Sequence, residues 1–230
     1  MAVQWHAILD QPAVGAICWL AALQIVPVEL IVAFGWRRPY DFATNYISDL
    51  GSTGCRVVSS GSIRYVCSPW HQAMNASFIV FGGLLLIGAV LLSSGWPRRG
   101  TAIAGRVLLC LAGACAIVIG MSPENVSYWP HALAGFTQLP FLNIGMILLG
   151  VSVLAAHRHI GLASISAGGV GMVATILYAS GSYGPLGAGI IERLPSTPLR
   201  CGWRSSAGGC CATRPLRRAG YRHDQRLRGC

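Results

Sequence analysis

Five long apolar segments with almost no charged residues constrain this chain more than any other feature. They cover residues 13–35, 75–92, 103–121, 131–156 and 160–180. An apolar run of about 18 or more residues is long enough to cross the hydrocarbon core of a bilayer, which is roughly 30 Å thick. A core helix of a soluble domain instead alternates apolar and polar faces. The sequence therefore predicts an all-α, polytopic transmembrane helix bundle with five visible spans and the lipid bilayer as its main partner.

The first segment is interpreted as an uncleaved helix rather than a secretory signal. The eleven residues before Pro12 contain no Arg or Lys and include Asp10, whereas a signal peptide begins with a basic region. All seventeen basic residues of the chain are Arg, which favours a GC-rich coding sequence and hence a bacterial source.

The tail, residues 193–230, differs in composition from residues 1–192, which we treat as the transmembrane helical domain. It holds nine of the seventeen Arg and four of the nine Cys, without apolar periodicity. Our hypothesis is that a frameshift near Leu194 replaced a sixth helix with this tail. The alternative is a genuine Arg-rich extension that contacts anionic lipid headgroups. Sequencing codons 185–205 separates the two, since only a frameshift leaves about 20 apolar residues in another frame.

The charge distribution gives no support for nucleic-acid binding, because the excess of basic residues lies in the tail. Residues 1–192 contain eight Arg against six acidic residues. Basic residues are retained on the cytoplasmic side of a membrane, but with the amino terminus inside, four of these Arg lie on each side. We predict a plasma-membrane protein with a cytoplasmic amino terminus, and a genuine tail would favour the opposite orientation.

The long loop, residues 36–71, is predicted to be extracytoplasmic. Cys55 and Cys67, twelve residues apart, could form a disulfide if this loop faces an oxidising compartment. Asp41, Asn45 and Asp49 recur every four residues, which predicts a short amphipathic helix over 39–51 with one polar stripe. The simplest interpretation is a helix at the membrane interface with its polar face in water.

Further polar residues lie at the ends of the predicted spans, and alternating spans bring them to one side of the membrane. His71 and Asn75 are one helical turn apart, and Glu124 and Asn125 precede His131. Glu29 lies inside the first span, where an unpaired carboxylate is unfavourable. We therefore expect it to pair with a partner such as His71, His131 or an Arg.

Several short motifs in fixed order resemble the bacterial membrane family filed as domain of unknown function 998. They are Tyr40-Asp41, Ile47-Ser48-Asp49-Leu50-Gly51, Asn75-Ala76-Ser77-Phe78-Ile79 with Gly82 and Gly83, and Pro123-Glu124-Asn125 with His131. The resemblance covers roughly residues 13–192 and implies a six-helix membrane protein without a settled activity. It also implies that seven residues are of functional interest: Ser48, Asp49, His71, Asn75, Glu124, Asn125 and His131.

Three classes of function stay open at this point. A membrane-embedded lipid hydrolase or transferase would use Asp49, His71, Glu124 and His131 as catalytic candidates, either around a Zn²⁺ ion or as a metal-free acid and base pair. The sequence contains no HExxH or GxSxG motif to support it.

A small-molecule or ion carrier is the second class, with Glu29, Ser48, Asn75 and Asn125 as binding candidates. In the third class, a structural or accessory protein, the polar residues only cap helices. The sequence leaves the reaction class, the cofactor, the metal and the ligand undetermined.

Overall fold

The computed structural model describes residues 11–59 and 63–196. It contains five helical segments long and apolar enough to cross a membrane. The first extends over Pro12–Phe34, and the others are α4 (His71–Leu91), α5 (Gly100–Met121), α6 (Tyr128–Val153) and α7 (Arg158–Ala179). The predicted all-α transmembrane class is confirmed. The tail lies outside the described residues from position 197 onward.

The helix boundaries differ from the hydropathy-based prediction at the polar ends of two spans. The prediction began the second span at residue 75 and the fourth at residue 131, whereas α4 begins at His71 and α6 at Tyr128. Hydropathy marks only the apolar part of a helix, but backbone hydrogen bonding continues through polar residues at the interface. The extra turn of α4 places His71 within a helix, and His131, the first residue of the predicted span, lies in the first turn of α6.

The first span is interrupted near its middle. Helix α2 (Pro12–Ala21) leads into a short 3₁₀ turn, η1 (Ala22–Gln24), and then into α3 (Ile25–Phe34). Pro27 has no backbone N–H, and its ring would crowd the carbonyl of Leu23 in a regular α-helix, so the tighter turn accommodates it. The Gln24 side chain pairs with Ser77 of α4 through two hydrogen bonds of 2.8 and 3.0 Å, which joins the two spans inside the bundle.

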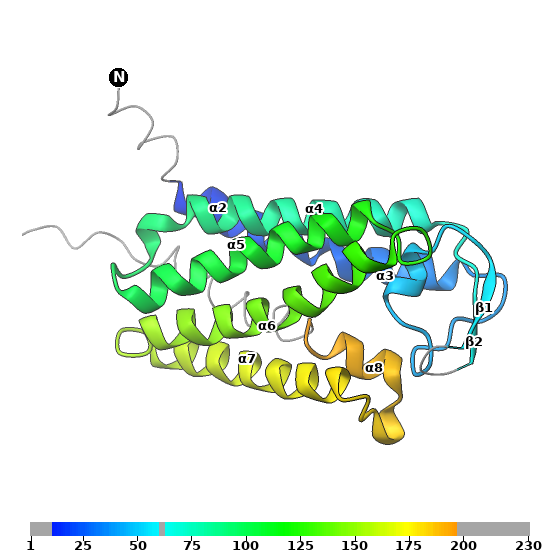
Figure 1. Cartoon of the computed structure of the whole chain (residues 1–230). Coiled ribbons are helices and arrows are strands. Elements are labelled where there is room, and N and C mark those ends of the chain that lie inside the picture. The colour runs from blue at the N-terminus through cyan, green and yellow to red at the C-terminus, as the bar shows by residue number, and fades with distance from the viewer. Residues whose placement is uncertain (1–10, 60–62, 197–230) are drawn as a thin grey trace, which may run out of the picture.

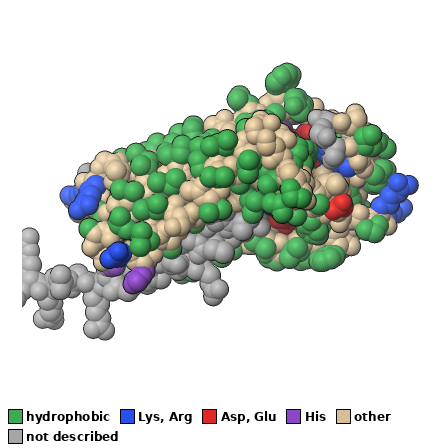
Figure 2. All heavy atoms as spheres, turned by 90° about the horizontal axis from the view of Figure 1, so that it is seen from below, with side chains coloured by type: hydrophobic (Ala, Val, Ile, Leu, Met, Phe, Trp, Pro, Cys, Tyr) green, Lys and Arg blue, Asp and Glu red, His purple; other side chains and the backbone are tan. Residues whose placement is uncertain are grey.

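Consecutive spans pack against one another along the bundle (Figure 1). Small residues allow these close approaches. A Cβ atom added to Gly82 of α4 would lie 2.3 Å from the Gly113 carbonyl of α5, and one added to Gly105 of α5 would lie 2.9 Å from the Gly145 carbonyl of α6. The outer surface carries many apolar side chains, and Arg side chains lie at the two ends of the face seen in Figure 2. This pattern fits a body surrounded by lipid.

The loop between α3 and α4 forms a compact cap at one end of the bundle (Figure 1). It contains η2 (Ser48–Gly51) and an antiparallel hairpin of β1 (Arg56–Val58) and β2 (Arg64–Val66), in which Val57 pairs with Tyr65. A disulfide joins Cys55 to Cys67 across the base of this hairpin.

The predicted amphipathic helix over 39–51 is wrong, because only η2 is helical in this stretch. Polar side chains bond to nearby backbone N–H groups instead, which competes with helix formation. The Asp41 carboxylate accepts from Ala43 N, and the Asp49 carboxylate accepts from Tyr46 N at 2.8 Å. Asn45 and Asp49 are buried, so these two residues do not form a solvated face.

A short helix, α8 (Ala188–Arg193), follows the last span after the 3₁₀ turn η4 (Gly184–Leu186) and packs against α7. Gly187 begins it with φ of 82°, and a Cβ there would lie 2.3 Å from the Ala43 carbonyl. Both the backbone conformation and the close contact therefore require glycine. Through this contact α8 lies directly against the cap loop.

The glycine contact between α4 and α5 predicts a position-specific stability loss. Gly82→Leu should lower the free energy of unfolding by about 1–3 kcal/mol or more, because the new side chain would overlap the α5 backbone. Gly83→Leu on the same helix is the control, since a Cβ there meets nothing within 4 Å. Thermal denaturation of the purified protein in detergent measures the difference. Equal melting temperatures for both variants would contradict the packing.

Candidate functional site

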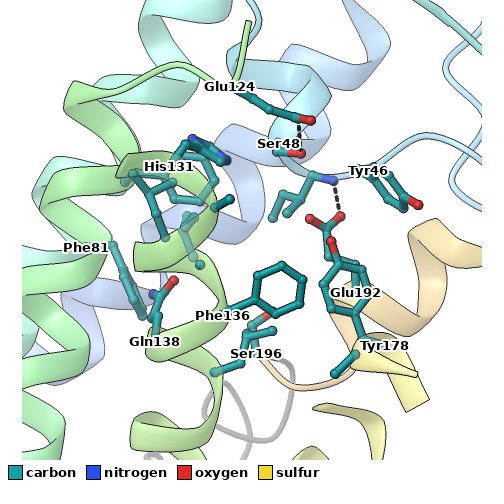
Figure 3. A pocket seen from close by; sticks show the side chains of 18 of the residues that line it. Tyr46, Ser48, Phe81, Glu124, His131, Phe136, Gln138, Tyr178, Glu192 and Ser196 are labelled. Atoms are coloured by element: carbon teal, nitrogen blue, oxygen red, sulfur yellow. Dashed lines mark hydrogen bonds between the residues drawn. The ribbon is translucent and has the colours of Figure 1, made fainter. Parts of the chain in front are cut away.

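A cavity of about 480 Å³ lies among the five spans and α8, beside the cap loop. Figure 3 shows labelled side chains from the cap loop, α4, α6, α7 and α8 around it. Most of its wall is apolar or aromatic, including Ile25, Phe78, Phe81, Ile119, Phe136 and Leu139. Ligand pockets in proteins commonly enclose roughly 300–1,000 Å³ with mainly apolar walls and a few polar groups. The size and lining of this cavity fall within that class.

Polar groups gather at the end of the cavity next to the cap loop. Ser48 Oγ donates a hydrogen bond of 2.9 Å to Glu124 Oε2 (Figure 3). His131 also lines this end, and its Nδ1 lies 2.8 Å from the Ser122 carbonyl. A carbonyl only accepts, so Nδ1 carries the proton in this contact and Nε2 of a neutral ring is left as an acceptor.

Glu192 of α8 forms a second carboxyl group at the cavity. Its Oε2 accepts a hydrogen bond of 2.6 Å from the Ile47 backbone N–H (Figure 3). Burial raises the pKa of Glu192 to about 8, although the positive charge of Arg193 and the Ile47 hydrogen bond act in the opposite direction. The negative charges of Asp49 and Glu124 raise this pKa further. The group therefore changes charge near neutral pH.

Four aromatic rings adjoin one another in the cavity wall. Tyr178 lies at their centre, with ring centroids of Phe136, Tyr46 and Tyr183 at 5.9, 6.1 and 6.3 Å. Tyr46 belongs to the cap loop, Phe136 to α6, and Tyr178 to α7. The rings bring parts of the chain that are distant in sequence to the same side of the site.

Asp49, one of the four catalytic candidates, is engaged in a bidentate salt bridge outside the cavity lining. Its two oxygens accept from Arg64 Nε at 2.7 Å and Arg64 Nη2 at 3.1 Å, and both side chains are almost fully buried. Burial alone would lower the pKa of Arg64, but the hydrogen bond and negative charge of Asp49 raise it above its ordinary value. Arg64 therefore keeps its positive charge, and the pair joins η2 to β2 within the cap loop.

His71, Asn75 and Asn125 also lie outside the cavity lining. Each contacts the backbone of the cap loop: His71 Nδ1 lies 3.0 Å from Ser68 O, Asn75 Nδ2 donates to Gly51 O at 3.0 Å, and Asn125 Oδ1 accepts from Thr53 N at 3.0 Å. These contacts hold the loop on the ends of the spans. Of the four catalytic candidates, only Glu124 and His131 line the cavity.

Glu29 forms a buried ion pair with Arg193, its Oε1 lying 2.6 Å from Arg193 Nε. The sequence predicts a partner for Glu29, and an Arg was one of the residue types proposed. The sequence analysis assigns Arg193 itself to the tail rather than to the helical domain. The same guanidinium donates to the carbonyls of Gly189 and Asn45 at 2.7 and 3.0 Å, and also to the Tyr40 hydroxyl. Arg193 thus makes its contacts with the helical body.

Sequence reasoning did not assign the aromatic part of the site. Tyr46, Phe136, Tyr178 and Tyr183 belong to none of the motifs that the sequence analysis singled out. Within residues 11–59 and 63–196, no group of three or more His, Cys, Asp and Glu lies close enough to hold a metal ion. The two His and two carboxylates considered for Zn²⁺ are therefore not gathered into one site.

Five apolar helices that pack around this cavity define a multi-pass α-helical membrane protein. Residues 17–198 match the family described as "Protein of unknown function (DUF998)", and the chain belongs to that family. This confirms the resemblance seen in the sequence motifs. The chain matches none of the curated proteins and none of the solved structures.

The raised pKa of Glu192 predicts a specific pH dependence of stability. The folded state favours the protonated carboxyl, so the stabilisation is complete below the ordinary pKa of 4.5 and is lost as the pH rises through about 8. The melting temperature of the wild type should fall between pH 5 and pH 9 by at least about 3 °C, given roughly 2–4 °C per kcal/mol for chains of this length.

Glu192→Gln is the matched variant for this measurement, because it keeps the shape of the side chain and cannot ionise. Its melting temperature should change less between pH 5 and pH 9 than that of the wild type in the same detergent. Identical pH profiles for the two proteins would contradict the assignment of this titration to Glu192.

Proposed function

We propose that this membrane protein binds a small amphipathic molecule in the cavity and acts as a carrier or binding protein. The observation that supports this most strongly is the division of the cavity into two parts. One end gathers Ser48, Glu124, His131 and Glu192, while the remaining wall is mainly apolar and aromatic, with polar exceptions such as Gln138 and Ser196 (Figure 3). An amphipathic ligand would place its headgroup at the polar end and its hydrocarbon part along the apolar wall.

The position of the site among membrane-spanning helices supports the same proposal. Amphipathic molecules partition into the bilayer, and a cavity between spans is reached from that phase or from the adjacent interface. The polar end lies against the cap loop, whose backbone is held by Asn75, Asn125 and the Asp49–Arg64 pair. A headgroup bound there would meet side chains whose positions are already set, which lowers the entropic cost of binding.

Lipid hydrolysis receives less support than binding. The Ser48–Glu124 hydrogen bond resembles a hydroxyl beside a base, but Asp49 is engaged with Arg64 and His71 contacts the cap-loop backbone. The four catalytic candidates therefore do not converge on one reacting centre, as acid and base catalysis requires.

We also propose that the cap loop faces outward from a plasma membrane and that the amino terminus is cytoplasmic. The Cys55–Cys67 disulfide supports this orientation, because disulfides persist in oxidising compartments. Arg64 is one of the four Arg that this orientation places outside the membrane, where basic residues are disfavoured, but its charge is balanced by Asp49. An impermeant thiol reagent applied to intact cells after reduction should label Cys55 and Cys67, and labelling only after cell lysis would reverse the orientation.

Filling the cavity should weaken ligand binding without disturbing the fold. Gly135 lines the cavity, and a Cβ at this position meets nothing within 4 Å. Gly135→Leu should weaken binding of the uncharged fluorescent amphiphile N-phenyl-1-naphthylamine by at least about tenfold, or 1.4 kcal/mol. Fluorescence titration in lipid nanodiscs, with empty nanodiscs subtracted, measures this affinity.

The control is Gly169→Leu on α7, where a Cβ also meets nothing within 4 Å and which does not line the cavity. Its affinity for the probe should equal that of the wild type. Unchanged binding to Gly135→Leu, or no saturable binding to the wild type, would refute a binding function for this cavity.

A further inference from the structure

The charges around the cavity favour a cation. Glu124 and Glu192 both line it, and among the described lining residues none is Arg or Lys. Two nearby Arg side chains are directed to other acids, with Arg64 Nε 2.7 Å from Asp49 and Arg193 Nε 2.6 Å from Glu29. An anionic headgroup would therefore meet two carboxyl groups and no lining Arg or Lys, which is unfavourable in a poorly hydrated site.

The aromatic rings add a second attraction for the same kind of headgroup. Tyr46, Phe136, Tyr178 and Tyr183 line the cavity, and the ring centroids of the other three lie 5.9–6.3 Å from the Tyr178 centroid. Their mutual orientations are mixed, since Tyr46 meets Tyr178 edge-on at 85° whereas Phe136 is tilted by only 32°. Rings in several orientations can present both edges and faces to one space, and a ring face attracts an ammonium group.

We propose that the polar end of the cavity binds an ammonium headgroup, so that the ligand is an amphipathic amine or quaternary ammonium compound. This rests on the proposed binding function and names its ligand class. The carboxyl groups of Glu124 and Glu192 compensate the positive charge, and the Tyr178 ring cluster contacts the carbon atoms attached to nitrogen. The alkyl part follows the apolar wall formed by Phe78, Phe81 and Leu139.

Binding of an ammonium headgroup requires both the carboxyl groups and the aromatic rings. Transferring an ammonium group out of water is strongly unfavourable without a compensating charge. The carboxyl groups supply that charge, and a cation beside Glu192 favours its ionised form. Aromatic contacts contribute about 0.5–2 kcal/mol and select for a headgroup with the charge spread over its methyl groups.

The experiment compares three amphiphiles that share one alkyl chain: octyltrimethylammonium, octanol and octyl sulfate. Isothermal titration calorimetry is performed on the full chain in lipid nanodiscs, with empty nanodiscs as the blank. Octyltrimethylammonium should bind at least about tenfold more tightly than octanol, and octyl sulfate should show no saturable binding. Glu124→Gln and Tyr178→Leu should each lower the affinity for octyltrimethylammonium about tenfold. Each should change the affinity for octanol less than about twofold.

Asp41→Asn is the matched charge control, because it removes an exposed carboxylate outside the cavity lining. Its ammonium affinity should equal that of the wild type. If Glu124→Gln does not fold, Glu192→Gln makes the same test. Equal affinities for octanol and the ammonium compound, both lost in Gly135→Leu, would overturn the ammonium proposal and leave the binding function intact. No saturable binding of any of the three amphiphiles would overturn both.

Discussion

The buried ion pair between Glu29 and Arg193 is the interaction on which the arrangement of the site depends. Glu29 comes from the first span and Arg193 from α8, which are separated by 164 positions in the sequence. The guanidinium also contacts the Asn45 carbonyl and the Tyr40 hydroxyl of the cap loop. Removing one partner of a buried pair leaves an uncompensated charge, which typically destabilises a protein by about 3–5 kcal/mol. The first span, the cap loop and α8 are therefore coupled.

This coupling positions the next residue, Glu192, at the cavity. Because Arg193 is held by Glu29, the adjacent carboxyl group reaches the Ile47 backbone N–H. On the other side of the cap loop, the Asp49–Arg64 pair holds the segment that carries Ser48. The polar end of the cavity is thus built by two charged pairs that do not line it themselves. The proposed ligand would contact the groups that these pairs position.

The interpretation of Asp49 illustrates why charged residues in a membrane protein are difficult to assign from sequence. Asp49 and Glu124 both lie outside the spans and both belong to motifs shared with the family. The structure pairs Asp49 with Arg64 in a bidentate contact, whereas Glu124 accepts from Ser48 at the cavity. The two roles differ because a cation lies beside Asp49, and that cation, Arg64, is fifteen residues away on the second strand of the hairpin. No local pattern encodes that proximity.

The spacing of Asp41, Asn45 and Asp49 predicts a helix, and this prediction is wrong because contacts with distant segments stabilise a loop instead. A four-residue repeat fits a helix, but short polar side chains also bond to neighbouring backbone groups. In the cap loop that alternative is stabilised by burial of Asn45 and Asp49 under the hairpin and α8. The approach of α8 requires Gly187 and Gly189, whose added Cβ atoms would each lie 2.3 Å from cap-loop carbonyls.

The sequence by itself determined the membrane-spanning class, the five spans and the family, because the length of an apolar run and the order of short motifs are properties of the chain alone. It also indicated that Glu29 needs a partner, since an unpaired intramembrane carboxylate is unfavourable wherever the chain folds. Only the tertiary structure decided that the partner is Arg193, and that Tyr46, Phe136 and Tyr178 share one wall with Glu124 and Glu192. Such contacts arise from the packing of distant segments, and neither periodicity nor composition specifies which segments meet.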